Sequence, residues 1–368
     1  MPPIKVLQVV TVMNRGGLET MVMNYYRKID KEKIQFDFIV HREERGDYDD
    51  EIESLGGNIY RMPAIKPGNY RKYFKALDNF FKEHNEYTTV HSHINENSGF
   101  VLKYAKKYGI QNRIAHSHIA DLKLDYKYPF RMYARMYLKP NTNKFFACSE
   151  KAGEWLFGKE GISNDQITIL NNAVDTNLFK YNVNIRNKVR NDLNIEDKFV
   201  IGHVGRFNPQ KNHKYLIDIF SEIYKLNNNA VLLLIGTGYM MDEIKLKVSE
   251  LGLNDSVKFL GLREDIHNMM QAMDIFLFPS LFEGLPVVLI EAQAAGLKCV
   301  TSTGVTKESD ITNSIEFIDL NVSAKEWANK ILSLDVTRKD FSHILISKGY
   351  DSTNNVNLLN NFYLLSQA

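Results

Sequence analysis

The sequence has little cysteine and no long apolar segment. Its 368 residues contain two cysteines, Cys148 and Cys299, which lie far apart and outside any metal-ligand spacing. This argues against a disulfide framework or a zinc site and fits a reducing compartment. No apolar run approaches the roughly 18 residues that a membrane span needs, and the start, MPPIKVLQVV, lacks the pattern of a signal peptide. We therefore expect a cytoplasmic protein, attached only peripherally, if at all, to the inner face of the cell membrane.

The sequence also lacks a strong excess of charge of one sign. Lys and Arg number 46 against 44 Asp and Glu, which gives a net charge of +2, and 44% of the residues are hydrophobic. These values are ordinary for a soluble globular protein, and we expect no nucleic-acid partner. A chain of 368 residues exceeds the usual size of one compact core, so we expect two domains.

Short apolar runs alternate with longer segments of helical period. The runs that predict strands include IKVLQVV (4–10), IQFDFIV (34–40), NRIAHSH (112–118), FVIGHVG (199–205), AVLLLIG (230–236) and DIFLFPS (274–280). Such alternation indicates parallel sheets with helices on both faces. The predicted fold class is therefore α/β, with two doubly wound, Rossmann-like domains facing across a cleft.

The series of alternating strands and helices starts twice, which places the domain boundaries. The first domain is predicted over 1–180 and the second over 199–345. Residues 181–198 are polar and rich in Asn, and their first half has no apolar stripe, which predicts a linker. Residues 346–368 are predicted to form a C-terminal helix that packs back on the first domain.

Turns that follow parallel strands are the candidate site, because ligands bind beyond the carboxyl ends of such strands. Gly16 and Gly17 lie between the first predicted strand and its helix, where backbone amides attract anions. Arg206 and Lys211 lie in GRFNPQKN, and two cations beside a helix N-terminus suit a phosphate group. A plain turn with solvated charges is the alternative for both segments.

The segment FEGLPVVLIEAQAAG (282–296) contains two carboxylates. Pro286 fits the first position of a helix and Gly296 its end, so we expect Glu283 in the turn before the helix and Glu291 one to two turns inside it. Carboxylates would repel phosphates, but each accepts hydrogen bonds from two sugar hydroxyls. Cations for a diphosphate and carboxylates for sugars together predict a nucleotide-sugar site. The alternative is a helix with a polar face.

Three segments, MNRGGLETMVMNYYRKID, GRFNPQKN and PSLFEGLPVVLIEAQAAGL, resemble the retaining GT-B glycosyltransferases of glycosyltransferase family four, in particular bacterial exopolysaccharide and capsule transferases. The resemblance spans nearly the whole chain. It implies transfer of a hexose or N-acetylhexosamine, with retention of configuration, from a nucleoside-diphosphate sugar such as a UDP-sugar. The acceptor it implies is a growing, often lipid-linked, oligosaccharide of an exopolysaccharide, capsule or O-antigen.

The resemblance also implies roles for individual residues. The catalytic residues would be Glu283, beside the reacting carbon, and His118, near the donor sugar and the acceptor; His93 is a candidate for acceptor contact. The donor-binding residues would be Gly16 and Gly17, Arg206 and Lys211 for the diphosphate, Leu262 and Arg263 for the base, Gly284, Leu285 and Val287 for the sugar, and Glu291 for the ribose. For either histidine alone, an ordinary strand-end histidine with satisfied hydrogen bonds is the alternative.

The expected chemistry needs no metal and no other cofactor. No Asp-x-Asp element stands at a strand end in the right place, so Arg206, Lys211 and helix N-termini would stabilise the leaving diphosphate. Two other interpretations stay open. The same two-domain fold hosts UDP-sugar 2-epimerases, whose acid and base groups we do not find here. A non-catalytic partner subunit of another transferase would keep the fold without the activity.

Residues 101–150 carry ten Lys and Arg against three Asp and Glu. Within them, DLKLDYKYPFRMYARMYLKP (121–140) repeats Arg131, Arg135 and Lys139 every four residues, with Tyr and Met at the same spacing. This predicts a basic, aromatic, amphipathic helix that lies on an anionic membrane surface. The alternative is a solvated basic face that packs on the core through its Tyr and Met side.

Overall fold

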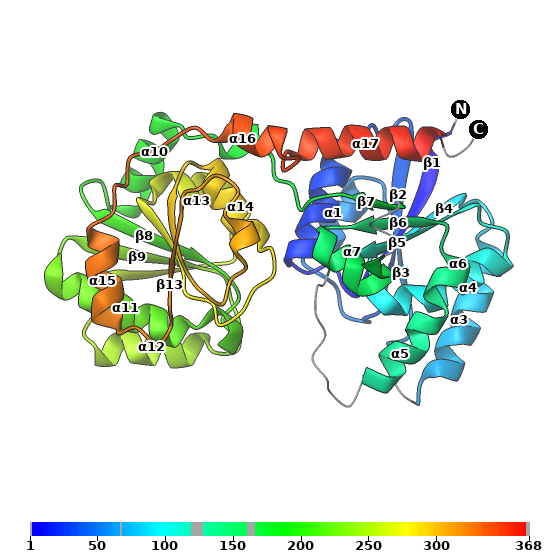
Figure 1. Ribbon diagram of the computed structural model, residues 1–368, viewed down its shortest axis with the longest axis horizontal. Coiled ribbons are helices and arrows are strands. Elements are labelled where there is room, and N and C mark those ends of the chain that lie inside the picture. Colours follow the sequence, from blue (N-terminus) through cyan, green and yellow to red (C-terminus); the bar gives the residue numbers. More distant parts are fainter. Residues whose placement is uncertain (1, 67, 119–127, 160–165, 366–368) are drawn as a thin grey trace. The chain divides into compact units, whose positions relative to one another are not determined.

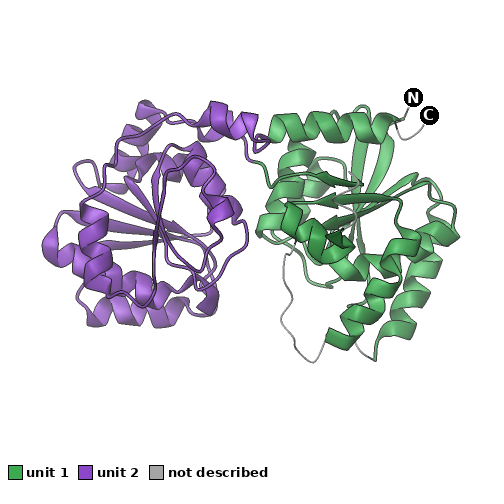
Figure 2. Cartoon of the chain, viewed as in Figure 1, with its two compact units in different colours: residues 1–173, 352–368 green, residues 174–351 purple. Residues whose placement is uncertain are grey.

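The computed structural model describes residues 2–66, 68–118, 128–159 and 166–365. The chain divides into two compact units, shown in Figure 2. Unit 1 comprises Met1–Ala173 together with Ser352–Ala368, and unit 2 comprises Val174–Asp351. The second unit is therefore an insertion in the sequence of the first.

Unit 1 is built on a seven-stranded parallel sheet of order β3-β2-β1-β4-β5-β6-β7. Its strands are β1 (Ile4–Val9), β2 (Ile34–Val40), β3 (Ile59–Arg61), β4 (Thr89–Ser92), β5 (Asn112–Ser117), β6 (Lys144–Ala147) and β7 (Ile167–Ile169). Its α-helices are α1 (Gly17–Lys28), α2 (Asp49–Ser54), α3 (Tyr70–Glu83), α4 (Ser98–Lys107), α5 (Tyr128–Met136), α6 (Leu138–Asn141), α7 (Glu150–Phe157) and α17 (Ser352–Leu365) (Figure 1). Alternate residues of β1 enter two different cores, Leu7 one and Val6 the other, because successive side chains of a strand point to opposite faces.

Unit 2 is built on a six-stranded parallel sheet of order β10-β9-β8-β11-β12-β13. Its strands are β8 (Phe199–Val204), β9 (Ala230–Ile235), β10 (Val257–Gly261), β11 (Ile275–Phe278), β12 (Lys298–Ser302) and β13 (Ile315–Ile318). Its α-helices are α9 (Thr176–Phe179), α10 (Val183–Leu193), α11 (His213–Leu226), α12 (Met241–Glu250), α13 (Ile266–Ala272), α14 (Val287–Ala294), α15 (Ala324–Leu332) and α16 (Ser342–Ser347). The predicted α/β class with two doubly wound sheets is confirmed.

The boundaries differ from those expected. Unit 1 ends at Ala173 rather than at 180, and the second unit extends to Asp351 rather than to 345. Helix α17 packs against α1, within unit 1. The prediction of a linker over 181–198 is wrong, because Val183–Leu193 forms helix α10, which packs against α13 inside unit 2.

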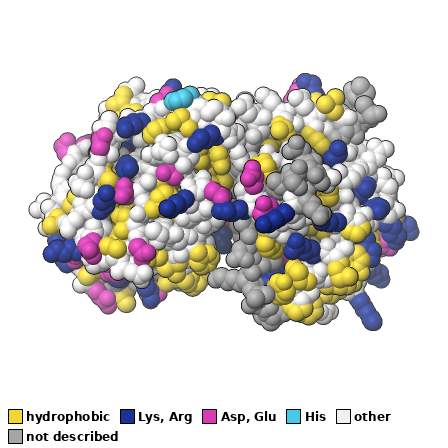
Figure 3. Space-filling view, in the orientation of Figure 1, with side chains coloured by type: hydrophobic (Ala, Val, Ile, Leu, Met, Phe, Trp, Pro, Cys, Tyr) yellow, Lys and Arg dark blue, Asp and Glu magenta, His cyan; other side chains and the backbone are white. Residues whose placement is uncertain are grey.

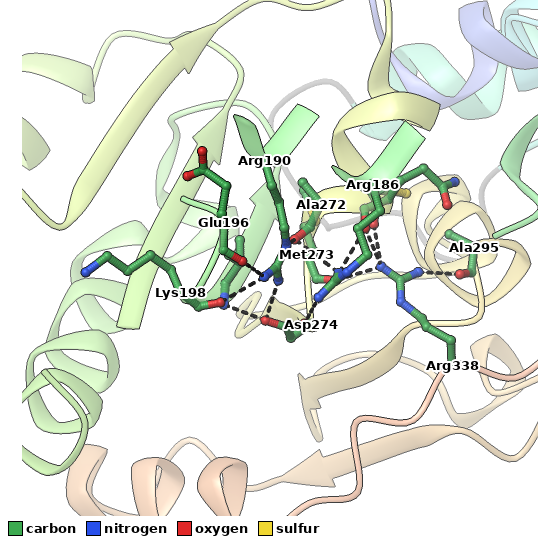
Figure 4. A network of polar contacts seen from close by, with 12 residues as sticks. Arg186, Arg190, Glu196, Lys198, Ala272, Met273, Asp274, Ala295 and Arg338 are labelled. Atoms are coloured by element: carbon green, nitrogen blue, oxygen red, sulfur yellow. Dashed lines mark hydrogen bonds and ion pairs between the residues drawn. The ribbon is translucent and has the colours of Figure 1, made fainter. Parts of the chain in front are cut away.

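Helix α10 is held by its arginines, which explains why its sequence is so polar. Arg186 and Arg190 donate to the two carboxylate oxygens of Asp274, at 2.5 and 2.7 Å (Figure 4). Both guanidinium groups also donate to carbonyl oxygens at the end of α13, and Arg338 donates to further carbonyls there. Cations favour a helix C-terminus, whose last carbonyls lack partners within the helix. The helix adds to these charged contacts an apolar contact with the core through Ile185, Val189 and Leu193.

Replacing Asp274 by Asn is expected to lower the free energy of unfolding by about 3–5 kcal/mol, because removal of one partner leaves buried charges uncompensated. Asp274 is 14% exposed, and Arg186 and Arg190 are 18% and 8% exposed. Chemical denaturation of purified protein measures the change.

The matched control is Asp50→Asn. Asp50 also pairs with an arginine, Arg45, but is 92% exposed, and surface pairs of that kind contribute about 0–1 kcal/mol. Equal effects of the two substitutions would contradict a stabilising role for the buried network.

Candidate functional site

The strand order of unit 2 reverses between β8 and β11, and this places two loops side by side. The helices that follow these strands, α11 and α14, belong to different hydrophobic cores and so cover opposite faces of the sheet. In open parallel sheets, ligands bind at the carboxyl ends of the strands that flank such a reversal. The loops after β8 and β11 are therefore the candidate site of this unit.

Hydrogen bonds join the two loops directly. The Leu281 amide donates to the Gln210 carbonyl at 2.8 Å, and the Gln210 side chain donates to the Phe282 carbonyl at 3.1 Å. The Asn212 side chain donates to the Pro279 carbonyl at 3.2 Å. These bonds set the distance between GRFNPQKN and the carboxylate-bearing segment without any ligand.

The loop after β9 fits against the loop after β8 through two glycines. Gly236 and Gly238 both have positive φ, at 130° and 158°. A Cβ on Gly236 would collide with the Gly205 carbonyl, and one on Gly238 would collide with the Phe207 carbonyl. The backbone beside Arg206 is therefore held by close contacts that only glycine allows.

Lys211 and Glu283 form an ion pair across the two loops. Lys211 Nζ lies 2.6 Å from Glu283 Oε1, with 17% and 12% of the side chains exposed. The ammonium group also lies 4.5 Å from the centre of the Phe278 ring. The backbone of Glu283 bonds to the loop after β12, since its amide donates to the Gly304 carbonyl at 3.1 Å. The structure thus brings together two residues that the sequence separates by 72 positions.

Arg206, in contrast, is exposed, and its side chain makes no hydrogen bond or ion pair with the described residues. Arg263, in the loop after β10, donates twice to the Asp265 carboxylate, at 2.8 and 2.7 Å. Leu262 beside it is 50% exposed. Arg206 is therefore exposed without a neutralising partner among the described residues, whereas the charge of Arg263 is neutralised locally by Asp265.

The helix after β11 starts one residue later than expected. Pro286 is the N-cap and α14 covers Val287–Ala294, so the prediction of Pro286 as the first helical residue is off by one; Gly296, with φ of 70°, follows the helix. The amides of Leu285 and Val287 donate to no described residue. A Cβ on Gly284 would meet nothing within 4 Å, so the backbone there is open to a ligand.

Glu291 lies one turn inside α14 and is half-buried, and its carboxyl makes no hydrogen bond or ion pair with the described residues. Burial raises the pKa of its carboxyl to about 7. Desolvation disfavours the charged form of a carboxyl, so an isolated carboxylate here is destabilising unless a donor reaches it.

Replacing Glu291 by Gln is expected to stabilise the protein at pH 8, on the order of 2 kcal/mol, and to change little at pH 4.5. Its folded-state pKa lies above its unfolded value, so the folded state holds the proton more tightly. The free energy of unfolding therefore falls as the pH rises through this range, and the substitution removes that loss. Unfolding of both proteins at the two pH values measures it.

Glu250→Gln, at an exposed position of α12, is the control and should show no such dependence on pH. A benefit of Glu291→Gln that has the same size at both pH values would show that burial of the charge is not its cause.

In unit 1, Gly16 is the N-cap of α1 and Gly17 its first residue, in the segment that follows β1. Gly16 has an extended backbone, with φ of −125°, which any residue adopts. A Cβ there would collide with the Glu19 carboxylate, at the end of a flexible side chain. The local backbone of unit 1 therefore gives no reason why position 16 is a glycine.

His93 and His118 follow β4 and β5 and lie together. His93 Nδ1 and His118 Nε2 are 2.9 Å apart, and His93 Nε2 lies 2.9 Å from Gln8 Oε1 on β1. Two further histidines, His91 and His116, complete a buried group that the prediction did not include. Its signal in the sequence is the tripeptide His-Ser-His, which occurs at 91–93 and again at 116–118.

The predicted basic helix over 121–140 is observed in part, as α5 and α6; residues 119–127 lie outside the described residues. The alternative, a solvated basic face that packs on the core through its Tyr and Met side, is not observed at the arginines. Arg131 Nε lies 3.7 Å from an oxygen of the buried Glu96, and Arg135 donates to the Trp155 carbonyl at 2.6 Å.

The exposed face of α5 is aromatic and apolar instead. Its exposed side chains include Tyr128, Phe130, Tyr133 and Met136. An open hollow of about 660 Å³ is lined by Met132, Met136, Phe157 and Lys139, among others. Figure 3 shows hydrophobic side chains gathered with Lys and Arg at the end of unit 1 where α5 lies. We call the exposed side chains of α5, together with the residues that line this hollow, the α5 surface.

The two α/β units match the fold of GT-B glycosyltransferase structures. A crystal structure of HepE from Anabaena in complex with UDP superposes with a TM-score of 0.78 at 19% identity, covering 99% of this chain and 100% of that one. No helix among the described residues is both long and apolar enough to span a membrane.

Sequence comparison gives the family. Residues 15–178 match the model of Glycosyltransferase Family 4, and residues 185–349 match that of Glycosyl transferases group 1. The chain is 36% identical to EpsF of Bacillus subtilis, which is named as a glycosyltransferase, over 98% of this chain and 97% of that protein. It is 24% identical to an Escherichia coli UDP-Gal:alpha-D-GlcNAc-diphosphoundecaprenol alpha-1,3-galactosyltransferase, over 81% and 79% of the two chains. The chain therefore belongs to glycosyltransferase family four.

Proposed function

We propose that this glycosyltransferase moves a hexose or N-acetylhexosamine from a UDP-sugar to a growing, lipid-linked oligosaccharide of a surface polysaccharide, with retention of the anomeric configuration. The observation that carries the proposal is the Lys211–Glu283 pair at the strand-order reversal of unit 2, beside the open amides of α14. The name of the Escherichia coli relative, which gives both a UDP-sugar donor and a lipid-linked acceptor, supports the two substrate classes.

The donor diphosphate is proposed to bind between Arg206 and Lys211. Arg206 offers a guanidinium group without a protein partner among the described residues, and Lys211 exchanges Glu283 for a phosphate oxygen. The released Glu283 carboxylate then accepts from hydroxyls of the donor sugar, and the amides of Leu285 and Val287 add donors without a side chain in the way. The ion pair thereby keeps both groups in position before the donor arrives.

Glu291 is proposed to hold the ribose diol. Its carboxyl lacks a partner among the described residues and has a pKa of about 7, so two hydroxyl donors would stabilise its charged form. The loop that contains Leu262 and Arg263 is proposed to face the base. From unit 1, His118 and the Gly16-Gly17 segment are proposed to contact the donor sugar and the diphosphate, and His93 the acceptor.

Transfer is proposed to proceed through an oxocarbenium-like state in which the diphosphate gains negative charge. Lys211, Arg206 and the helix N-terminus stabilise that charge. One unit-charge contact at ~4 Å and an effective dielectric near 20 contributes roughly 4 kcal/mol, or close to three powers of ten in rate. The proposed route is front-face attack by the acceptor hydroxyl, assisted by the departing phosphate, without a metal.

Lys211→Ala and Glu283→Gln are each expected to lower turnover at least about a hundredfold, because each removes a group that meets charge in the transition state. Purified protein is incubated with a panel of nucleotide-sugars and an undecaprenyl-diphosphate-linked acceptor, and the released nucleoside diphosphate is measured. The panel identifies the donor. Activity is expected to persist in EDTA.

Lys214→Ala is the matched control, since Lys214 lies one turn further along and pairs with Glu243 at an exposed position. Near-normal transfer by Lys211→Ala or Glu283→Gln would contradict the assignment. Isomerised nucleotide-sugar would favour a 2-epimerase, and no reaction with any donor would favour a non-catalytic partner subunit.

The α5 surface is proposed to lie on an anionic membrane, where a lipid-linked acceptor resides. Its exposed Tyr133 and Met136 would enter the interface, with Lys139 near the headgroups. Replacing Tyr133 and Met136 together by Ser is expected to weaken flotation with vesicles that contain phosphatidylglycerol by about tenfold, because interfacial binding scales with the apolar area buried.

The control for flotation is Leu226→Ser in unit 2, which removes an apolar side chain that is 54% exposed. If the wild-type protein does not float with anionic vesicles even at low salt, the membrane proposal is wrong. Equal losses for the two variants would place the contact elsewhere.

A further inference from the structure

Four histidines of unit 1, His91, His93, His116 and His118, form one compact array on a single face of the sheet. His91 and His93 are two residues apart at the end of β4, as are His116 and His118 at the end of β5, so each pair points to one side. The parallel register pairs His91 with Ile114 and Ser92 with Ala115, which sets His93 beside His116. His91, His93 and His116 are at most 4% exposed.

The nitrogen atoms of this array are close enough for shared ligation. His91 Nε2 lies 3.1 Å from His116 Nδ1, and one ring nitrogen each of His91, His93 and His116 lies within 4.8 Å of the other two. In a tetrahedral site with Zn–N bonds of about 2.0–2.1 Å, two ligand nitrogens are roughly 3.3 Å apart. The rings of His91 and His93 are stacked, with centroids 4.3 Å apart, so the imidazoles must rotate to direct one nitrogen each at a single ion.

The outer hydrogen bonds already have the arrangement that metal ligation requires. Gln8 Oε1 only accepts, so His93 Nε2 carries the proton and its Nδ1 presents a lone pair. His91 Nδ1 lies 2.6 Å from the Tyr363 hydroxyl, which leaves its Nε2 on the inner side. Metal-binding histidines typically use one nitrogen for the ion and the other for an oxygen partner of this kind.

The array also has polar atoms that the protein does not satisfy. His116 Nε2 is buried and has no hydrogen-bond partner among the described residues. A buried nitrogen without a partner costs free energy, so the hydrogen bonds of the protein alone do not satisfy this array.

We propose that His91, His93 and His116 form a binding site for a divalent transition-metal ion of the zinc type. Three imidazoles suit zinc and similar ions rather than Mg²⁺ or Ca²⁺, which prefer oxygen ligands. The site uses none of the residues of unit 2 that are proposed to bind the donor, but it shares His93 with the proposed acceptor contact. The His93 Nδ1 lone pair that would bind the ion now accepts a hydrogen bond from His118, so metal binding releases His118.

Zinc retention tests the site without reference to transferase activity. Full-length protein made without a polyhistidine tag is treated with EDTA, exposed to ZnCl₂ and dialysed, and its zinc content is measured. About one Zn²⁺ per chain is expected, with a Tm that rises with the Zn²⁺ concentration. His91→Gln and His116→Gln should each lower retention at least about tenfold.

His84→Gln, an exchange at a histidine outside the array whose ring centroid lies 4.5 Å from that of Phe80, is the control and should retain zinc. Unchanged retention in His91→Gln and His116→Gln would place the ion elsewhere. If these variants do not fold, the Co²⁺-loaded wild-type protein decides, because tetrahedral Co²⁺ with nitrogen ligands gives strong visible absorption. A wild-type protein that retains no zinc, or that shows no such absorption, overturns the proposal.

Discussion

All strands of each sheet run parallel, and this constraint determines where the other features of both units lie. Parallel strands end at one edge, so residues far apart in the sequence meet there. Lys211 follows β8 and Glu283 follows β11, and they form an ion pair because these two strands are neighbours. His93 and His116 meet in the same way at the ends of β4 and β5. The opposite edge of the second sheet carries Asp274 with its arginines, which give stability and are remote from the candidate site.

Three partly buried carboxylates of unit 2 differ in how many partners compensate their charge. Asp274 is fully matched, by two arginines and the Val200 amide. Glu283 has one cation, Lys211, and Glu291 has no partner among the described residues. A buried charge with ion-pair and hydrogen-bond partners is compatible with a stable fold. A buried charge without such a partner raises the free energy of the protein until another molecule supplies one. The proposed donor site coincides with the positions where matching is incomplete.

The sequence predicted those features that follow from local pattern. Apolar runs gave the strands, and Gly296 gave the end of α14 within a residue. The failures concern side chains whose partners are distant in the sequence. The polarity of 181–198 suggested a linker because Asp274, which binds Arg186 and Arg190, lies more than 80 residues away. Arg131 and Arg135 fitted a solvated stripe because Glu96 and Trp155 cannot be placed from sequence alone. The pairing of Lys211 with Glu283 likewise depends on the strand order, which periodicity does not contain.

Helix α17 has a consequence for synthesis of the protein. Its Tyr363 is buried against Phe36 of β2 and bonds to His91 of β4, although it follows all of unit 2 in the sequence. During translation, unit 2 has all of its residues before unit 1 does. Unit 1 therefore cannot be completed, and the aromatic surface of β2 and the histidines of β4 stay uncovered, until α17 has left the ribosome. Unit 1 is thus begun before unit 2 but completed after it. A nascent chain that stalls after unit 2 would expose the uncovered surface of unit 1 to chaperones.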